Sequence, residues 1–246
     1  NVAEEAEKLL IANPRLSEEA LLNGLRNPDY LSLILEDPLL SVGKQIGLVG
    51  ELLFLEKLID RADATSISRT KAFSAWKNGS RDFSNNGVVV EVKTSGGKTR
   101  KHPISEITQL ELRGTETELY VLSASAAPDS SGSNRLPDHV QNLLTKLTSS
   151  QQTTLLNRLR TWWRGGGGYD HGTRGSYVGE QPLSIIFQPA LFAITPPSTP
   201  RVQPLVRASL AHGPGHAEDI QYKLNLEPLN PLPPADFDAV LDKLLA

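Results

Sequence analysis

The segment 88–94 constrains this chain of 246 residues more than any other feature; it reads Val-Val-Val-Glu-Val-Lys-Thr. It is rich in β-branched residues and follows the turn-forming Asn85-Asn86-Gly87, which predicts the second strand of a β-hairpin. Side chains alternate along a strand, so Glu91 and Lys93 share one face. Because an unpaired buried charge is costly, both need partners, and the hairpin would bring Asp82 beside Glu91.

A helix is predicted over residues 42–60, and one glutamate occupies an unusual place on it. With 3.6 residues per turn, Glu51 lies in the middle of the apolar stripe, whereas Glu56 falls on the polar side and is expected to face solvent. The apolar stripe consists of Leu48, Phe54, Leu55 and Leu58. Gly47 and Gly50 thin the surface around Glu51, so another backbone can approach closely.

The remaining pattern predicts an α/β fold in which helices flank a central mixed sheet. Further helices are expected as short pieces within 4–40, and at 103–110, 137–147, 153–163 and 236–245. Further strands are expected at 72–77, 119–123, 183–187, 191–195 and 220–226. Four glycines at 165–168 suggest a joint. The chain is therefore divided into an N-terminal helical segment (1–42), a core (43–150) and a C-terminal α/β extension (151–246).

Composition excludes several classes of protein. The chain has no cysteine, which rules out a disulfide scaffold, a thiolate zinc site, an iron–sulfur cluster and a cysteine nucleophile. Its net charge of -3 argues weakly against a protein that coats nucleic acid, although a local basic groove is compatible with it. The chain lacks an apolar run of membrane-spanning length and a secretory signal at its start, so we expect a cytoplasmic protein without membrane contact.

Three carboxylates and one lysine that meet in space have a definite chemical use. Two carboxylates and a strand carbonyl can hold Mg²⁺, which prefers oxygen ligands, and a neighbouring lysine can orient a water for attack. The chemistry would be phosphodiester hydrolysis. The alternatives are a solvated strand face for Asp82, Glu91 and Lys93, and an ion pair between Glu51 and Lys44.

These residues resemble the motifs of the PD-(D/E)xK nuclease superfamily, and more narrowly those of the family DUF4420. The resemblance covers roughly residues 43–230. It rests on the segment 45–56 (QIGLVGELLFLE), Trp76, Asp82-Phe83, Glu91-Val92-Lys93-Thr94, Ile104-Ser105 and Gln109-Leu110. One departure is Arg81, which precedes Asp82 where the superfamily name has proline.

The resemblance implies a restriction-endonuclease-like core and a metal-dependent DNA endonuclease that acts in bacterial restriction or antiviral defence. Asp82, Glu91 and the Val92 carbonyl would hold Mg²⁺, for which Mn²⁺ can substitute. Glu51 would complete or orient the site, and Lys93 would position the attacking water. Gln109 and Ser105, one turn apart on the predicted helix 103–110, either face the scissile phosphate or serve as a core amide and a helix cap.

Two basic stretches are candidates for DNA contact. The first comprises Lys98, Arg100, Lys101 and His102, for which a solvated loop is the alternative. The second includes Arg160 and Arg164 beside Trp162 and Trp163, and such a pairing can grip phosphates and stack bases or simply pack into a core. His212 and His216 are a weak candidate for a metal pair.

Other functions are compatible with the same residues. One is a non-catalytic DNA-binding or assembly subunit that retains the nuclease fold, and another is RNA cleavage by the same chemistry. Cutting both strands of a duplex needs two sites, so a homodimer or partner subunits of a restriction system are expected.

Overall fold

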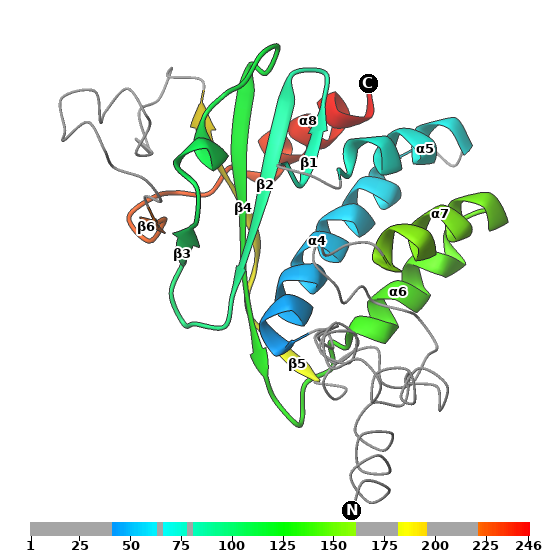
Figure 1. Cartoon of the computed structure of the whole chain (residues 1–246), viewed down its shortest axis with the longest axis horizontal. Coiled ribbons are helices and arrows are strands. Elements are labelled where there is room, and N and C mark those ends of the chain that lie inside the picture. The colour runs from blue at the N-terminus through cyan, green and yellow to red at the C-terminus, as the bar shows by residue number, and fades with distance from the viewer. Residues whose placement is uncertain (1–40, 63–65, 78–80, 161–181, 196–220) are drawn as a thin grey trace, which may run out of the picture. The chain divides into compact units, whose positions relative to one another are not determined.

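The computed structural model describes residues 41–62, 66–77, 81–160, 182–195 and 221–246. Two compact units can be distinguished, one formed by Ile46–Thr148 and Gln181–Ala246, the other by Asn1–Gln45 and Ser149–Glu180. Elements are numbered as in Figure 1. The helices are α4 (Val42–Arg61), α5 (Ser66–Ala75), the 3-10 helix η1 (Ile107–Leu110), α6 (Leu136–Thr145), α7 (Ser149–Arg160) and α8 (Pro234–Leu245). The strands are β1 (Phe83–Asn85), β2 (Val88–Ser95), β3 (Lys101–Ile104), β4 (Glu118–Pro128), β5 (Leu183–Thr195) and β6 (Tyr222–Asn225).

A four-stranded mixed sheet with the order β1-β2-β4-β5 forms the centre of the first unit (Figure 1). Strand β2 pairs antiparallel with β1 and parallel with β4, and β5 pairs antiparallel with β4. Asn86 and Gly87 form the two-residue turn between β1 and β2 with φ angles of 48° and 79°, the left-handed region that Asn and Gly tolerate best. The predicted hairpin and the predicted α/β class with a mixed sheet are confirmed.

Helix α4 packs against one face of the sheet, the face of β2 that carries Val92 and Thr94. A Cβ atom added to Gly50 would lie 1.8 Å from Thr94 Oγ1 and 3.3 Å from Val92 Cγ1, so only glycine permits this approach. The close approach expected at Gly50 is therefore confirmed. The fully buried members of α4 are Leu48, Val49, Leu52, Phe54, Leu55 and Leu58.

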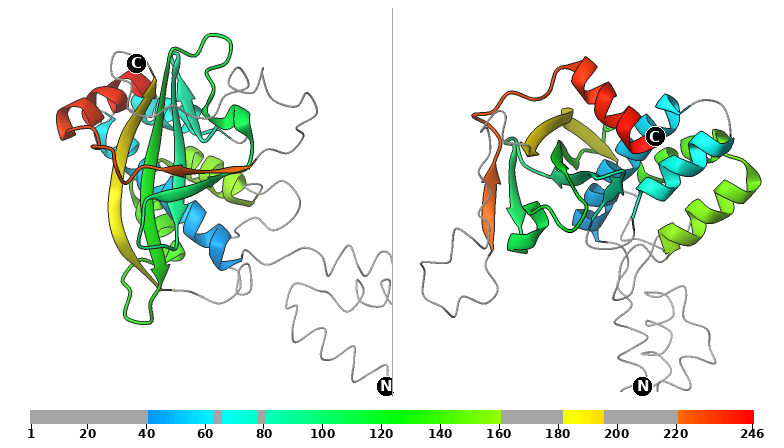
Figure 2. Two further views of the ribbon diagram at one scale, coloured as in Figure 1. Left: turned by 90° about the vertical axis from the view of Figure 1, so that its left-hand side faces the viewer. Right: turned by 90° about the horizontal axis from the view of Figure 1, so that it is seen from above.

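The small sheet of β3 and β6 covers the opposite face, as the two views of Figure 2 show. Its inward residues join a core cluster with alternate residues of β2, β4 and β5. That cluster contains Val89, Ile104, Leu110, Leu119, Val121, Phe192, Ile194, Leu224 and Leu226. Because Glu91 and Lys93 lie on this face of β2, the apolar cluster borders the charged pair.

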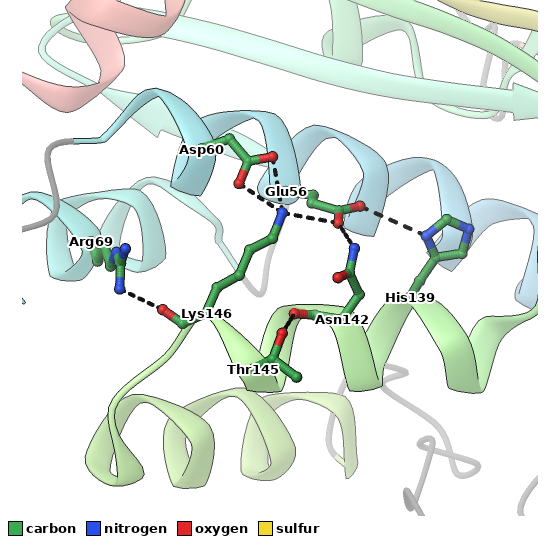
Figure 3. A network of polar contacts seen from close by, with 7 residues as sticks. All are labelled: Glu56, Asp60, Arg69, His139, Asn142, Thr145 and Lys146. Atoms are coloured by element: carbon green, nitrogen blue, oxygen red, sulfur yellow. Dashed lines mark hydrogen bonds and ion pairs between the residues drawn. The ribbon is translucent and has the colours of Figure 1, made fainter.

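A polar network fixes α4 to α6 (Figure 3). Glu56 accepts a hydrogen bond from Asn142 and lies 3.2 Å from Lys146 Nζ, which also contacts Asp60 at 2.7 Å. The Arg69 guanidinium of α5 donates to the main-chain oxygen of Lys146 at 2.6 Å. The side chain of Glu56 is only 15% exposed, so the expectation that it faces solvent was wrong, because α6 covers this side of α4.

Helix α8 returns to the β1–β2 hairpin and to α4. The side-chain amides of Asn85 and Asn86 donate to main-chain oxygens of the last turn of α8. Phe237 stacks on Phe54 with ring centroids 6.2 Å apart, and Arg61 makes a bidentate ion pair with Asp242 at 2.7 Å. The end of the chain thus supports both elements that carry the candidate site.

Two predicted elements differ from the structure. Residues 72–75 are helical rather than extended, because Ala72 and Phe73 are spaced to be buried on one side of α5, next to Trp76, which directly follows the helix. Segment 103–110 is not one helix. His102 and Ile104 are buried and alternate with exposed neighbours in β3, which pairs with β6, more than a hundred residues later. Only the part that forms η1 is helical. The strands predicted at 183–187 and 191–195 form the single strand β5, whose register with β4 shifts near its middle.

Helix α7, in the second unit, begins four residues before the predicted helix 153–163 and buries Leu155 and Leu159. Residues 161–163 of that prediction lie outside the described residues. The expectations for 4–40, the glycines at 165–168, Arg164 with its tryptophans, and His212 and His216 lie outside the described residues. Within the described ranges, no helix combines the length and the apolar character needed to cross a membrane.

Candidate active site

The hairpin places Asp82 against the strand that carries Glu91. Asp82 directly precedes β1, whose Phe83 pairs with Val90, so Asp82 lies beside the next residue of β2. Its Oδ2 accepts a hydrogen bond of 2.7 Å from the Val92 main-chain N–H. The sequence-based expectation that the turn brings Asp82 next to this strand agrees with this geometry.

Glu91 and Lys93 form the centre of a hydrogen-bonded chain on one face of β2. Lys93 Nζ donates to Glu91 Oε1 at 2.8 Å and to Gln109 Oε1 at 3.2 Å. Gln109 Nε2 in turn donates to Ser105 Oγ at 3.1 Å. The side chains of Glu91 and Lys93 are 5% and 16% exposed, so both charges sit in a largely dry environment where electrostatic contacts are strong. The four residues meet although the predicted helix 103–110 does not form.

Glu51 approaches the same hairpin from α4. The buried Trp76 indole donates to Glu51 Oε2 at 2.8 Å, which satisfies a carboxylate in an apolar stripe. The segment around Trp76 is bonded directly to the hairpin, since Trp76 bridges to Phe83 and the Lys77 N–H donates to the Asp82 main-chain oxygen at 2.7 Å. Sequence reasoning missed this role of Trp76. The available signal was that a buried indole N–H usually requires an acceptor.

Two neighbouring carboxyl groups act electrostatically on Asp82. Burial raises the pKa of Asp82 well above its ordinary value of 3.8, and the charges of Glu91 and Glu51 raise it further. The Lys93 ammonium and the Val92 N–H oppose this rise of the pKa. Like charges held together in this way are typical of sites that bind a cation or run acid–base chemistry.

The donor set fits a divalent ion of the magnesium type. In the part of the chain that the structure describes, no three His, Asp or Glu side chains are grouped so that they could hold a metal ion by themselves. Mg²⁺ does not require such a group, since it commonly takes one or two carboxylates and completes its shell with water and substrate phosphates. Asp82 and Glu91 offer two carboxylates, and Glu91 Oε2 is buried without a hydrogen-bond partner.

The residues expected to contact DNA differ in their accessibility. Lys98, Lys101 and Ser105 are exposed, and Arg100 is partly exposed, with its guanidinium bonded to the main-chain oxygens of Ser123 and Gln188. His102 is 1% exposed, and its Nε2 lies 2.7 Å from Ser123 Oγ.

Burial lowers the pKa of His102 to about 4, with further contributions from the charges of Lys93 and Arg100. Its imidazole is therefore neutral at pH 7 and belongs to the interior. Arg160 ends α7 in the second unit, and Arg164 lies outside the described residues.

A mixed sheet flanked by helices, with an aspartate and a Glu-x-Lys strand joined in one hairpin, defines a PD-(D/E)XK nuclease-like core. Comparison with known families identifies the chain more closely. The family model described as "Putative PD-(D/E)XK family member, (DUF4420)" matches residues 29–161, more than half of the chain, and the chain belongs to this family. The family noted from the motifs is thereby confirmed, although the match begins before and ends before the segment 43–230 given for the resemblance. Membership indicates a nuclease-like function. Neither the curated proteins nor the solved structures include a match to this chain.

Proposed function

We propose that the protein is a divalent-metal-dependent endonuclease that hydrolyses phosphodiester bonds of DNA. The observation that carries the proposal is the convergence of Asp82, Glu91 and Lys93 in one hydrogen-bonded hairpin, with a Glu91 oxygen that is buried and has no donor. An unpartnered buried acceptor is costly, so this oxygen is available to a cation.

Each residue has a part in this proposal. Asp82, Glu91 and the Val92 carbonyl would hold Mg²⁺, or Mn²⁺ in its place. The ion would supply electrostatic stabilisation of the charge that develops on the phosphoryl group. Lys93 would orient the attacking water and stabilise the same charge. Gln109 Oε1 accepts a second hydrogen bond from the Lys93 ammonium at 3.2 Å and would help to orient it.

Glu51 supports the site from α4. The Trp76 indole holds Glu51 Oε2. Glu51 would therefore act through its negative charge and as a hydrogen-bond partner for water. The exposed Lys98 and Lys101 would contact the phosphate backbone, because such contacts position the nucleic acid without reading its sequence. DNA as substrate and a role in bacterial restriction or antiviral defence are parts of the proposal that the motif resemblance suggests. A homodimer or partner subunits would supply the two sites that cutting both strands of a duplex needs.

A plasmid-cleavage assay with Mg²⁺ tests the proposal. Lys93→Ala and Asp82→Ala should each lower the cleavage rate by roughly 100-fold or more, as expected when a group that stabilises the transition state is lost. Asp238→Ala and Lys57→Ala remove the same charges from exposed positions on α8 and α4 and should cleave like the parent. Cleavage that survives both site substitutions would refute the assigned site. Replacing the plasmid with RNA of the same sequence tests the choice of substrate.

One observation favours a second function, that of a non-catalytic DNA-binding or assembly subunit. The Trp76 indole already occupies Glu51 Oε2, which leaves this carboxylate less free to bind a metal ion. A parent protein that binds a DNA duplex in a fluorescence-anisotropy titration but cleaves nothing with Mg²⁺ or Mn²⁺ would support this alternative over the nuclease.

A further inference from the structure

Arg81 occupies the place of the proline in the superfamily name and makes an unusually dense set of contacts. Its side chain is 6% exposed, and its guanidinium pairs with both oxygens of Glu116, at 3.0 Å from Nε and 2.6 Å from Nη2. Nη1 donates to the main-chain oxygen of Gln109 at 2.6 Å, and Nη2 also donates to that of Glu111. A planar guanidinium has a fixed fork of donors, so it holds these three partners in one relative geometry.

These contacts connect the β1–β2 hairpin, which carries Asp82, with η1, which carries Gln109. Arg81 is the residue before Asp82, and it fixes the backbone of η1 at Gln109. The side chain of Gln109 accepts from Lys93 Nζ at 3.2 Å. If η1 moved away, the Lys93 ammonium would keep its contact of 2.8 Å with Glu91 and lose the second acceptor that fixes its direction.

We propose that Arg81 is a positioning residue that sets the Gln109 amide against the Lys93 ammonium and so holds Lys93 in its working orientation. It touches no reacting group and acts through Gln109. The kinetic part of this inference rests on the proposed nuclease function, whereas the structural part does not.

The first test is Arg81→Lys, which keeps the positive charge and loses the fork. We expect kcat for plasmid cleavage to fall roughly 10- to 100-fold, as a misplacement of about 1 Å can cause. KM for DNA should stay unchanged, because Arg81 is buried and faces Glu116 rather than the surface. Arg69→Lys is the matched control, since Arg69 also bonds a main-chain oxygen, that of Lys146, on the far side of α4.

A mutant cycle separates positioning from general support of the fold. In a Gln109→Ala background the contact with Lys93 is already lost, so Arg81→Lys should then change kcat less than about twofold. An equal fall in kcat in both backgrounds would overturn the inference, because Arg81 would then act by another route. Thermal unfolding of all four proteins shows whether each is folded at the assay temperature.

A second readout does not depend on cleavage. The Lys93 ammonium protons are held by Glu91 and Gln109, so their exchange with water, followed by NMR with ¹⁵N-labelled lysine, should be faster in Arg81→Lys than in the parent. If the parent cleaves nothing, the proposed function fails, and this exchange rate still decides the role of Arg81. An unchanged rate in the folded variant overturns the inference. If Arg81→Lys does not fold, Glu116→Gln, which loosens the same guanidinium, takes its place.

Discussion

Replacing Gly50 with alanine tests whether the close packing of α4 on β2 positions Glu51. The added Cβ would lie 1.8 Å from Thr94 Oγ1 and 3.0 Å from Thr94 Cβ, well inside the distance of ordinary van der Waals contact. Either Thr94 turns away or α4 moves off the sheet. Because Glu51 is the next residue of α4, a movement of the helix also displaces its carboxylate from Asp82.

Two effects of opposite sign set the change in the free energy of unfolding caused by Gly50→Ala. Overpacking a well-packed interior costs about 1–3 kcal/mol, and alanine is favoured over glycine inside a helix by about 1 kcal/mol. The difference is a net loss of about 0–2 kcal/mol, which lowers Tm by up to ~8 °C in a chain of this size. The cleavage rate should fall by up to roughly 100-fold even where the protein stays folded, because a shift of about 1 Å in a site can have that effect.

Thermal unfolding and plasmid cleavage are measured together with two further variants. Gly43→Ala is the matched control, because a Cβ at Gly43 in the same helix meets nothing within 4 Å, so this change should not destabilise the protein. Thr94→Ala removes the nearest clashing atom, a buried hydroxyl without a hydrogen-bond partner, and should restore part of the loss in the Gly50→Ala background. A Gly50→Ala protein as stable as the Gly43→Ala protein, or no recovery on adding Thr94→Ala, would refute the reasoning.

Three further predictions concern buried polar groups. Trp76→Phe removes the donor to Glu51 Oε2 and should cost about 1–3 kcal/mol in urea unfolding, whereas an unchanged midpoint would show that the contact contributes nothing. For His102, whose pKa burial lowers to about 4, the unfolded chain binds more protons below pH 6.5, so the free energy of unfolding should fall by ~3 kcal/mol between pH 6.5 and 4. His102→Gln should abolish this part of the pH dependence, and parallel curves for parent and variant would contradict the assignment. The raised pKa of Asp82, caused by burial and then by Glu91, makes its ionised form unfavourable, so the stability it contributes at low pH is lost as pH rises. The Tm of Asp82→Asn should therefore exceed that of the parent by more at pH 7 than at pH 4, and cleavage should be abolished. A variant whose Tm at pH 7 is lower than that of the parent would argue against this reasoning.

The hairpin and the helix of the candidate site were predictable because their signals are local. The Asn-Asn-Gly turn sets the pairing of β1 with β2, and alternation along β2 puts Glu91 and Lys93 on one face. The 3.6-residue period places Glu51 in the buried stripe of α4. Each of these patterns involves residues that are close together in the sequence, so the sequence alone determines them.

The partners of those residues were decided by tertiary structure. Trp76 is 25 residues from Glu51 and Arg81 is 35 residues from Glu116, distances over which no periodicity links donor and acceptor. Residues 103 and 104, predicted to open a helix, belong instead to strand β3, because β6 supplies its hydrogen bonds. Local spacing selects which side chains point inward, whereas the fold selects which of them meet, because a hydrogen bond or a strand pair requires both partners in place.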